Sequence, residues 1–232
     1  MVDKVTYGMR LSISTVTLLI LSACTSQDVI DIEGSDNKGL YTIQTSFPVV
    51  EKAPVYLKLR ASRTSADFSQ DIPDGKYVFF EDLQITGPDG VTVESDIDTA
   101  SISIGFLDDA GIDRLSMAIF LGVSQTRFNA DVFFQSGPSV MIRDRIRELY
   151  LDAGIWYEVA DRLKLGLAYA LSMNADVSGL IELELSLSYR LLSHMEITVG
   201  LRDFTYNYNE GESRSSLWVQ SKGPFVMLNF PF

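Results

Sequence analysis

The chain has 232 residues, and its 31 acidic and 19 basic residues give a formal net charge of −12 at pH 7. No basic stripe is available for phosphates, which excludes nucleic acid as a partner. A single cysteine excludes an intrachain disulfide and a thiolate metal cluster. After residue 23 no run approaches the roughly 18 apolar residues of a membrane helix, so a membrane-spanning form of this chain must be a closed barrel.

The N-terminus has the organisation of a secretory signal. Two basic residues precede a short apolar segment, residues 11–23, and the tetrapeptide LSAC follows at residues 21–24. This tetrapeptide resembles the lipobox of bacterial lipoproteins, which implies cleavage before Cys24 and a diacylglycerol on its sulfur. An ordinary signal peptide cut nearby and an uncleaved anchor are the alternatives. We expect a lipoprotein signal peptide at residues 1–23 and lipidation of Cys24.

The next segment, residues 24–53, is polar, with Gly and Asp interruptions and no sustained period. This composition favours a periplasmic linker. Within it, residues 41–50 could form an extra strand or lie beneath the barrel.

From residue 54 onwards, large apolar residues alternate with small or charged ones. A period of two places the two classes on opposite faces of a β-strand. The clearest case is a hairpin at residues 162–191, whose halves are joined by NADVSG. Eight strands are predicted: 55–68, 97–107, 112–128, 148–159, the two halves of the hairpin, 195–208 and 217–232.

The predicted connections alternate between long and short. The first long one, residues 69–96, contains Pro88-Asp89-Gly90, which predicts a hairpin between residues 83–85 and 91–93. The second long one contains MIRDRIREL, which predicts a possible helical turn. Long loops at one end and short turns at the other are typical of outer-membrane barrels. An even strand number would return the C-terminus to the end where the first strand begins, which predicts that both termini are periplasmic.

Alternation alone would also suit a soluble sandwich or a lipocalin-like barrel with its leucines inside. Two features favour leucines that face lipid. Small residues crowd the opposite face, as an eight-stranded interior requires; they are Gly122, Gly154, Gly166, Ala168, Ala170, Ser186, Ser188 and Gly200. Four rings on the leucine face fall near the expected periplasmic end and form an aromatic girdle; they are Phe106, Tyr157, Tyr189 and Phe232.

Balanced charges on the other face are the third feature. A desolvated lumen requires its charges to be paired. The predicted luminal network comprises Lys58, Arg60, Asp152, Glu158, Lys164, Glu182, Glu184, Arg190, Glu196 and Arg202, with Glu148 on the same face. A structural salt-bridge network explains this set better than an acid/base pair or a cation site.

These features together resemble the small outer-membrane β-barrels, the outer-membrane protein A-like group. The resemblance covers residues 54–232. It implies an all-β fold, an eight-stranded antiparallel up-and-down transmembrane β-barrel, in the outer membrane of a Gram-negative cell envelope and in contact with outer-membrane lipids. In that group a terminal aromatic residue belongs to the signal read by the barrel-assembly machinery, a role that falls here to Phe232. Most members have ordinary signal peptides, so the lipobox departs from the pattern.

Some small barrels are enzymes that use a His with a Ser near the outer rim. Here the only histidine, His194, lies in a predicted periplasmic turn, out of reach of any outer-rim serine. No catalytic residue, cofactor or metal ligand is therefore predicted, and no external ligand is indicated. The expected function is a non-enzymatic barrel with a plugged lumen, structural or binding through acidic outer loops. A narrow solute pore and a soluble lipid-binding lipoprotein are the alternatives.

Overall fold

The computed structural model describes residues 29, 31–35, 39–49, 53–80, 82–109, 111–174, 178–209 and 215–231. The predicted signal peptide, the proposed lipidation site Cys24 and the terminal Phe232 lie outside these residues. Within the described ranges no helix is long and apolar enough to cross a membrane.

The described residues are almost entirely β-structure. The strands are β1 (Ile32–Ser35), β2 (Gly39–Pro48), β3 (Val55–Ile72), β4 (Tyr77–Phe80), β5 (Leu83–Thr86), β6 (Asp89–Asp109), β7 (Leu115–Phe134), β8 (Ser139–Ala160), β9 (Leu163–Met173), β10 (Gly179–Leu192), β11 (Met195–Tyr208) and β12 (Leu217–Pro231). The all-β prediction is confirmed.

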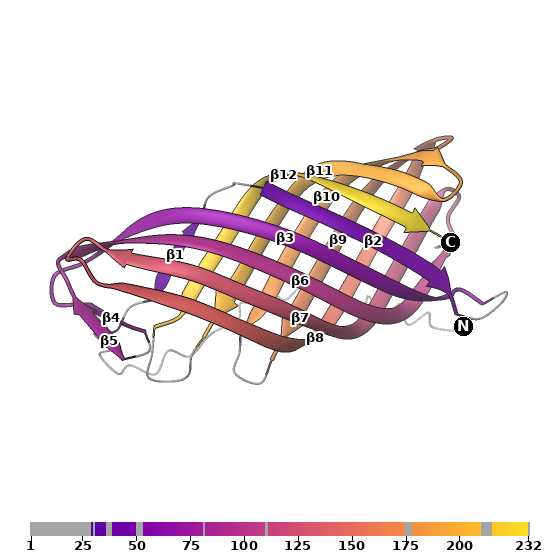
Figure 1. The fold of residues 1–232 in the computed structure, drawn as a ribbon. Coiled ribbons are helices and arrows are strands. Elements are labelled where there is room, and N and C mark those ends of the chain that lie inside the picture. The colour runs from indigo at the N-terminus through magenta and orange to yellow at the C-terminus, as the bar shows by residue number, and fades with distance from the viewer. Residues whose placement is uncertain are drawn as a thin grey trace, which may run out of the picture.

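Nine of these strands close into a barrel, in the order β2-β3-β6-β7-β8-β9-β10-β11-β12. Neighbours are antiparallel except at the closure, where β2 and β12 run parallel, with Tyr41 opposite Val226. Figure 1 shows the two arrows side by side and pointing to the same end. The short strand β1 pairs with β12 in the same register, because both ladders join residues 185 positions apart. β1 and β2 therefore follow one edge of β12.

The ninth barrel strand corrects the prediction of eight antiparallel strands. It comes from the segment that was expected to be a linker, in which an extra strand was only an alternative. Its alternation is weak in the sequence, because outward Tyr41 and Ile43 are followed by a polar stretch, residues 44–46. The odd strand number also separates the two ends of the barrel chain. Ile32 lies at the end where β12 begins, whereas Pro231 lies at the opposite end.

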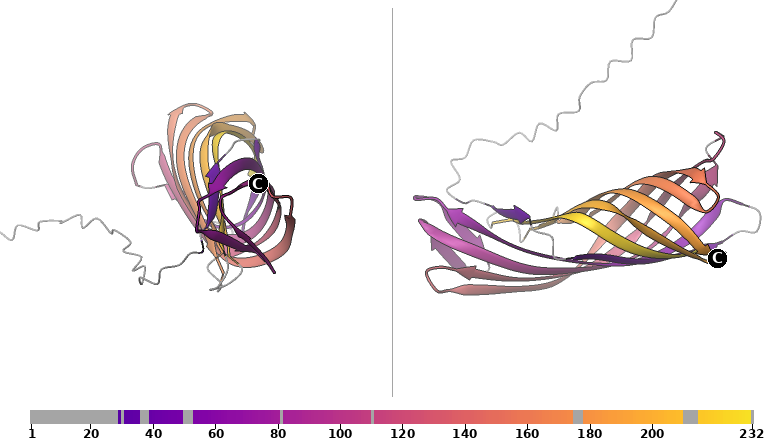
Figure 2. Two further views of the ribbon diagram at one scale, coloured as in Figure 1. Left: turned by 90° about the vertical axis from the view of Figure 1, so that its left-hand side faces the viewer. Right: turned by 90° about the horizontal axis from the view of Figure 1, so that it is seen from above.

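Four consecutive barrel strands are much longer than the rest. β3, β6, β7 and β8 have 18, 21, 20 and 22 residues, whereas β9 to β12 have between 11 and 15. The long strands project beyond the others at one end as a curved half-cylinder (Figures 1 and 2). We call this part the extension; it comprises residues 63–72, 89–99, 125–134 and 139–148. The two-residue turns 161–162 and 193–194 lie at the other end, which we call the short-turn end.

The extension corrects the predicted long loops. Most of residues 69–96 continue β3 and β6, which pair from Ile72 opposite Asp89 onwards. The local hairpin is β4 with β5, so the predicted pairing of residues 83–85 with 91–93 is wrong. The MIRDRIREL segment is part of β8, so the predicted helical turn is also wrong. At the tip, the Ser136 hydroxyl donates to the Asp89 carboxylate at 2.6 Å, with help from backbone N–H groups, and these bonds lower the pKa of Asp89.

The concave face of the extension has a hydrophobic core. Buried side chains there include Phe68, Val93, Phe128, Val132 and Ile142. They are covered by Val78 and Phe80 of the β4–β5 hairpin, Ile32 of β1, Leu217 and Val219 of β12, and Tyr206 and Tyr208 of β11. The convex face is mainly polar, with Phe133 and Met141 as exposed apolar residues. The extension is therefore packed like a water-soluble sheet.

The closed part of the barrel has the opposite arrangement. Leu165 and Leu185 are 46% and 51% exposed on the outer face, whereas Glu184, on the inner face, is 5% exposed. Small inward residues make room for large ones: a Cβ at Gly154 or Gly166 would lie within 2.5 Å of the Trp156 ring. We call the outward residues the apolar band; they include Ile102, Ile104, Phe106, Met117, Ile119, Leu121, Val123, Leu149, Ile155, Tyr157, Leu165, Leu167, Ile181, Leu183, Leu185, Leu187, Tyr189, Val199, Leu201 and Val226.

The parallel closure can be tested by cross-linking. Ile43→Cys with Leu228→Cys, in a Cys24→Ser background, should form a disulfide, because the two residues are direct neighbours in the β2–β12 ladder. The measurement is a mobility shift on a non-reducing gel. The matched control is Ile43→Cys with Tyr189→Cys on β10, which should remain reduced. A linker at residues 41–46 would give no preference for the first pair.

Candidate functional site

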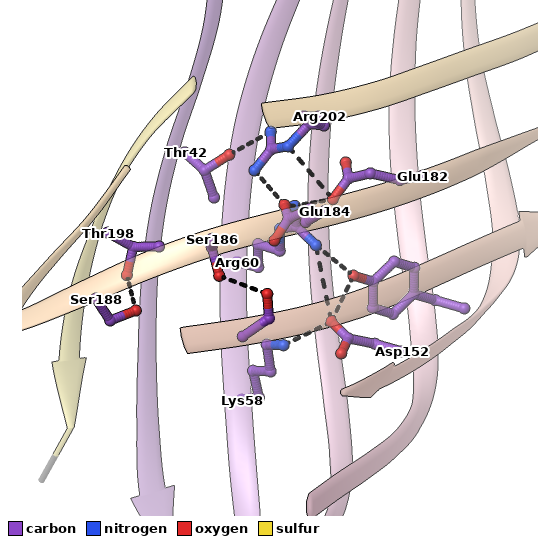
Figure 3. Close-up of polar contacts among 12 residues, drawn as sticks. Thr42, Lys58, Arg60, Asp152, Glu182, Glu184, Ser186, Ser188, Thr198 and Arg202 are labelled. Carbon is purple, nitrogen blue, oxygen red and sulfur yellow. Dashed lines mark hydrogen bonds and ion pairs between the residues drawn. The ribbon is translucent and has the colours of Figure 1, made fainter. Parts of the chain in front are cut away.

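The most concentrated group of chemically active side chains lies inside the closed part of the barrel. Lys58 and Arg60 come from β3, Asp152 from β8, Glu182 and Glu184 from β10, and Arg202 from β11. Figure 3 shows these side chains converging across the lumen from opposite walls. The strands place them there because each occupies an inward position of the period-two pattern.

Arg60 is the centre of this cluster. Its guanidinium contacts Glu182, lies 2.9 Å from Glu184 and lies 3.7 Å from Asp152. Asp152 also receives Lys58 Nζ at 2.5 Å. Arg202, whose side chain is fully buried, contacts Glu184 and lies 3.7 Å from Glu182. Three cations thus meet three carboxylates, which is how buried charges are tolerated.

Neutral groups complete the cluster. Arg202 Nη1 donates to Thr42 Oγ1 at 2.8 Å, which ties the closing strand β2 to β11. Tyr150 Oη accepts from Arg60 at 3.1 Å and donates to Asp152 at 3.0 Å. The Arg202 guanidinium also lies 4.3 Å from the centroid of the Phe225 ring, which is a cation–π geometry. Thr42 and Tyr150 were not predicted, since hydroxyl groups leave no distinctive pattern in the sequence.

Glu148 lies further along β8 and is held differently. Its carboxylate accepts hydroxyl hydrogen bonds from Thr126 (2.8 Å), Ser172 (2.9 Å), Tyr206 (3.1 Å) and Ser124 (3.3 Å). Its inward position agrees with the sequence analysis. Four neutral donors take the place of a cation, which satisfies the lone pairs of this buried carboxylate.

The four remaining predicted members of the network lie nearer the short-turn end. Glu158 is directly opposite Lys164, and Arg190 is directly opposite Glu196. Within the described ranges no ion pair joins any of them to another residue. Lys164, Arg190 and Glu196 line a cavity of about 310 Å³ beneath the central cluster. The structure therefore brings six of the predicted side chains into contact and leaves these four outside the cluster, three of them at the wall of this cavity.

Beyond Glu148 the interior is filled by aromatic side chains. The Phe128 ring stacks on Tyr206 and Tyr208, with centroids 5.4 and 4.8 Å apart. All three residues belong to the core of the extension. The arrangement is thus a polar cluster closed on one side by an apolar plug.

Histidine and metal chemistry find little support in the geometry. His194 is exposed in the turn between β10 and β11, where its Nδ1 lies 3.4 Å from the hydroxyl of the adjacent Ser193. This contact joins sequence neighbours in open solvent and lacks an orienting carboxylate among the described side chains. Among all the residues that the structure describes, no group of three His, Cys, Asp or Glu side chains is arranged to hold a metal ion.

Three of the predicted girdle residues fall where the sequence analysis expected them. Phe106, Tyr157 and Tyr189 are exposed on the outer face of the barrel, towards the short-turn end. The fourth, Phe232, lies outside the described residues. Large exposed rings at one end of an apolar band are the arrangement described for aromatic girdles.

The cluster should be essential for barrel stability. Arg202→Met removes one cation and leaves Glu182 and Glu184 with a single guanidinium, so we expect a loss of about 3–5 kcal/mol in the free energy of unfolding. Urea unfolding in detergent micelles, followed by circular dichroism, measures it. The control Arg63→Met breaks an exposed pair and should cost about 0–1 kcal/mol. Adding Glu184→Gln to Arg202→Met should recover part of the loss; equal losses for Arg202→Met and Arg63→Met would contradict a cohesive cluster.

No family model, curated protein or solved structure matches the chain. The functional argument therefore rests on the fold and on the geometry of the side chains.

Proposed function

We propose that this chain is a non-enzymatic outer-membrane β-barrel with a plugged lumen, and that its long strands carry a folded extension into the water outside the cell. The observation that supports this proposal is a reversal of the apolar face within continuous strands. The same strand buries its apolar side chains in the extension and exposes them in the closed part.

Strand β7 makes the reversal plain. Between Met117 and Val123 its exposed outward residues are all large and apolar, and the residues between them face the lumen. From Gln125 to Asp131 the outward residues are polar, whereas Phe128, Ala130 and Val132 face inward and are buried. Because the strand does not break, a change from lipid to water around it accounts for the reversal.

Strand β8 reverses at the position that matches β7, and β11 has a reversal of its own, at a position that lies opposite exposed Leu183 of β10. On β8 the outward residues change from Arg147 to Leu149, and in the ladder these two lie opposite Gln125 and Val123 of β7. On β11 the outward residues change from Leu201 to Asp203, and the inward ones from Arg202 to Phe204. A boundary shared by several strands is expected at a membrane surface.

The height of the apolar band also suits a membrane. On β10 the exposed apolar residues run from Ile181 to Leu191, a length of about 33 Å at roughly 3.3 Å per residue. A strand tilt of about 40° reduces this to roughly 25 Å, the height of the apolar band in outer-membrane barrels.

The alternatives receive less support. A soluble lipid-binding barrel needs its leucines inside, but Leu165 and Leu185 are on the outer face. A narrow solute pore needs a continuous aqueous path, but the charged cluster and the Phe128 stack cross the lumen. Planar-bilayer recordings distinguish these cases, and we expect no conductance.

The orientation follows from the two ends of the barrel. Short turns of outer-membrane barrels face the periplasm, so the extension faces outward and β12 ends in the periplasm, where Phe232 would meet the barrel-assembly machinery. The parallel closure then brings Ile32 to the outer side. This modifies the expectation that both termini are periplasmic. Cys24 is eight residues before Ile32, and an extended chain of that length spans at most about 28 Å, so we propose that a diacylglycerol on Cys24 is anchored on the outer side.

The extension is the proposed contact surface for an external partner. The acids that were expected in loops stand mainly on the outer faces of β3 and β6; these are Asp67, Asp71, Glu94, Asp96 and Asp98. A rigid sheet holds them in fixed positions. The chain therefore resembles the small outer-membrane barrels in general. Its ninth strand and parallel closure depart from the pattern of the eight-stranded group.

A single charge on the apolar band tests the membrane assignment. Leu185→Arg should destabilise the vesicle-inserted barrel by about 2–4 kcal/mol, because the guanidinium would face lipid. The measurement is urea-dependent folding into phospholipid vesicles. The control is Ser139→Arg on the extension, which should change stability by no more than about 0.5 kcal/mol. Equal, small effects of both changes would indicate that the band faces water.

Epitope tags test the orientation. A tag inserted between Ser136 and Gly137, at the tip of the extension, should bind antibody on intact cells. A tag between Ser193 and His194, at the short-turn end, should bind only after the outer membrane is permeabilised. The reverse labelling pattern would indicate the opposite orientation of the barrel. If neither tag were labelled on intact cells, this result would argue against an extension that faces outward.

A further inference from the structure

A row of arginines lies directly beyond the apolar band on the outer face. Arg127 of β7 is opposite Arg145 of β8, and Arg147 follows two residues later, opposite Gln125. The next outward row is already part of the band, with Val123 opposite Leu149. Three guanidinium groups therefore stand at the level where the outer face changes from polar to apolar.

These arginines are unusual in a chain with a net charge of −12. Like charges placed directly opposite each other destabilise a sheet, and Arg127 and Arg145 are placed in this way. Within the described ranges, Arg127, Arg145 and Arg147 have no carboxylate at ion-pair distance. The neighbouring Arg143, by contrast, pairs with Asp131 at 2.5 Å.

The nearby acids are engaged elsewhere. Asp98 faces Arg127 across the β6–β7 ladder, but its carboxylate lies 3.8 Å from Arg63 on the other side. Asp144 accepts a hydrogen bond from the backbone N–H of Arg145 at 2.6 Å. The three guanidinium groups therefore have no carboxylate partner among the described residues and can contact an external anion.

An apolar hollow adjoins the arginines on the membrane side. It has a volume of about 970 Å³, and its floor is one register row across four strands: Ile102, Val123, Leu149 and Met173. Gln125 and Arg147 line its edge towards the extension. Beyond Leu149 no described strand pairs with the second edge of β8, which leaves this side of the hollow open.

We propose that Arg127, Arg145, Arg147 and this hollow bind a phosphorylated lipid of the outer leaflet. Its phosphate groups would contact the guanidinium groups, and one acyl chain would lie in the hollow. Arginine suits this task, because its planar group binds phosphate through two parallel hydrogen bonds. A lipid is favoured over a soluble anion because Arg147 and Leu149 are about 7 Å apart along one strand, so a single ligand must be both anionic and apolar.

The inference rests on the proposed membrane function and names the lipid partner. The test uses the full chain in detergent micelles with a bis-phosphorylated, acylated glucosamine disaccharide as the probe, and native mass spectrometry or microscale thermophoresis measures affinity. Changing Arg127, Arg145 and Arg147 together to Gln should weaken binding about tenfold or more. The wild-type chain should bind the dephosphorylated lipid equally weakly.

A matched control removes the same amount of charge elsewhere. Arg114 and Lys222 are exposed cations with a carboxylate at 4 Å or less, and Arg162 is exposed in the turn between β8 and β9. Their triple change to Gln should leave affinity unchanged. Undiminished binding by the first triple variant would overturn the site. Competition by inorganic phosphate as effective as that by the lipid would overturn the lipid as ligand. Insertion of both variants into vesicles is measured separately. Normal insertion with undiminished lipid binding would contradict the site alone, whereas failure of the wild-type chain to insert would contradict the membrane assignment.

Discussion

The constraint on which this structure depends is that a barrel strand has only two faces. Its backbone groups are paired with both neighbours, so each side chain must face either the lumen or the surroundings. Apolar residues that change face along an unbroken strand therefore support the proposed change from lipid to water along that strand. In β7 this happens between Val123 and Gln125, and the ladder carries the boundary to β8 between Leu149 and Arg147. On the proposed membrane assignment, lipid surrounds one part of each long strand and water surrounds the other.

The interior changes at the same level, and this keeps both parts packed. Below the boundary the lumen is polar and is neutralised by Arg60, Arg202 and their carboxylates. Above it, Phe128 and Tyr206 begin an apolar core. Glu148 lies between them and accepts hydrogen bonds from hydroxyls on β7, β9 and β11. Because hydroxyl groups satisfy this carboxylate, Glu148 needs no cation beside it. It can therefore lie between the charged layer and the apolar core.

The sequence predicted correctly those strands in which the large apolar residues stay on one face along the whole strand. The hairpin at residues 162–191 and the strand at residues 195–208 were placed almost to the residue, because Leu and small residues alternate without interruption. In the long strands the apolar residues change from the outer to the inner face. The sequence analysis interpreted this change as the end of the strand, so it predicted these strands too short. In β8, inward Ile142 and Ile146 and outward Leu149 are spaced like one face of a helix, although they lie on two faces of a strand.

The charged cluster was predicted for the same reason, because charged residues at inward positions indicate a polar lumen. Its attachment to the closing strand β2 was not predicted. Thr42 stands in a weakly patterned segment, yet it accepts a hydrogen bond from Arg202 across the β2–β12 seam. That seam joins residues 185 positions apart, so the ring can close only after nearly the whole chain is available. Arg202 contacts both Thr42 and Glu184, so the charged cluster is joined directly to the closing strand β2. The parallel seam is therefore stabilised from the lumen as well as by its backbone ladder.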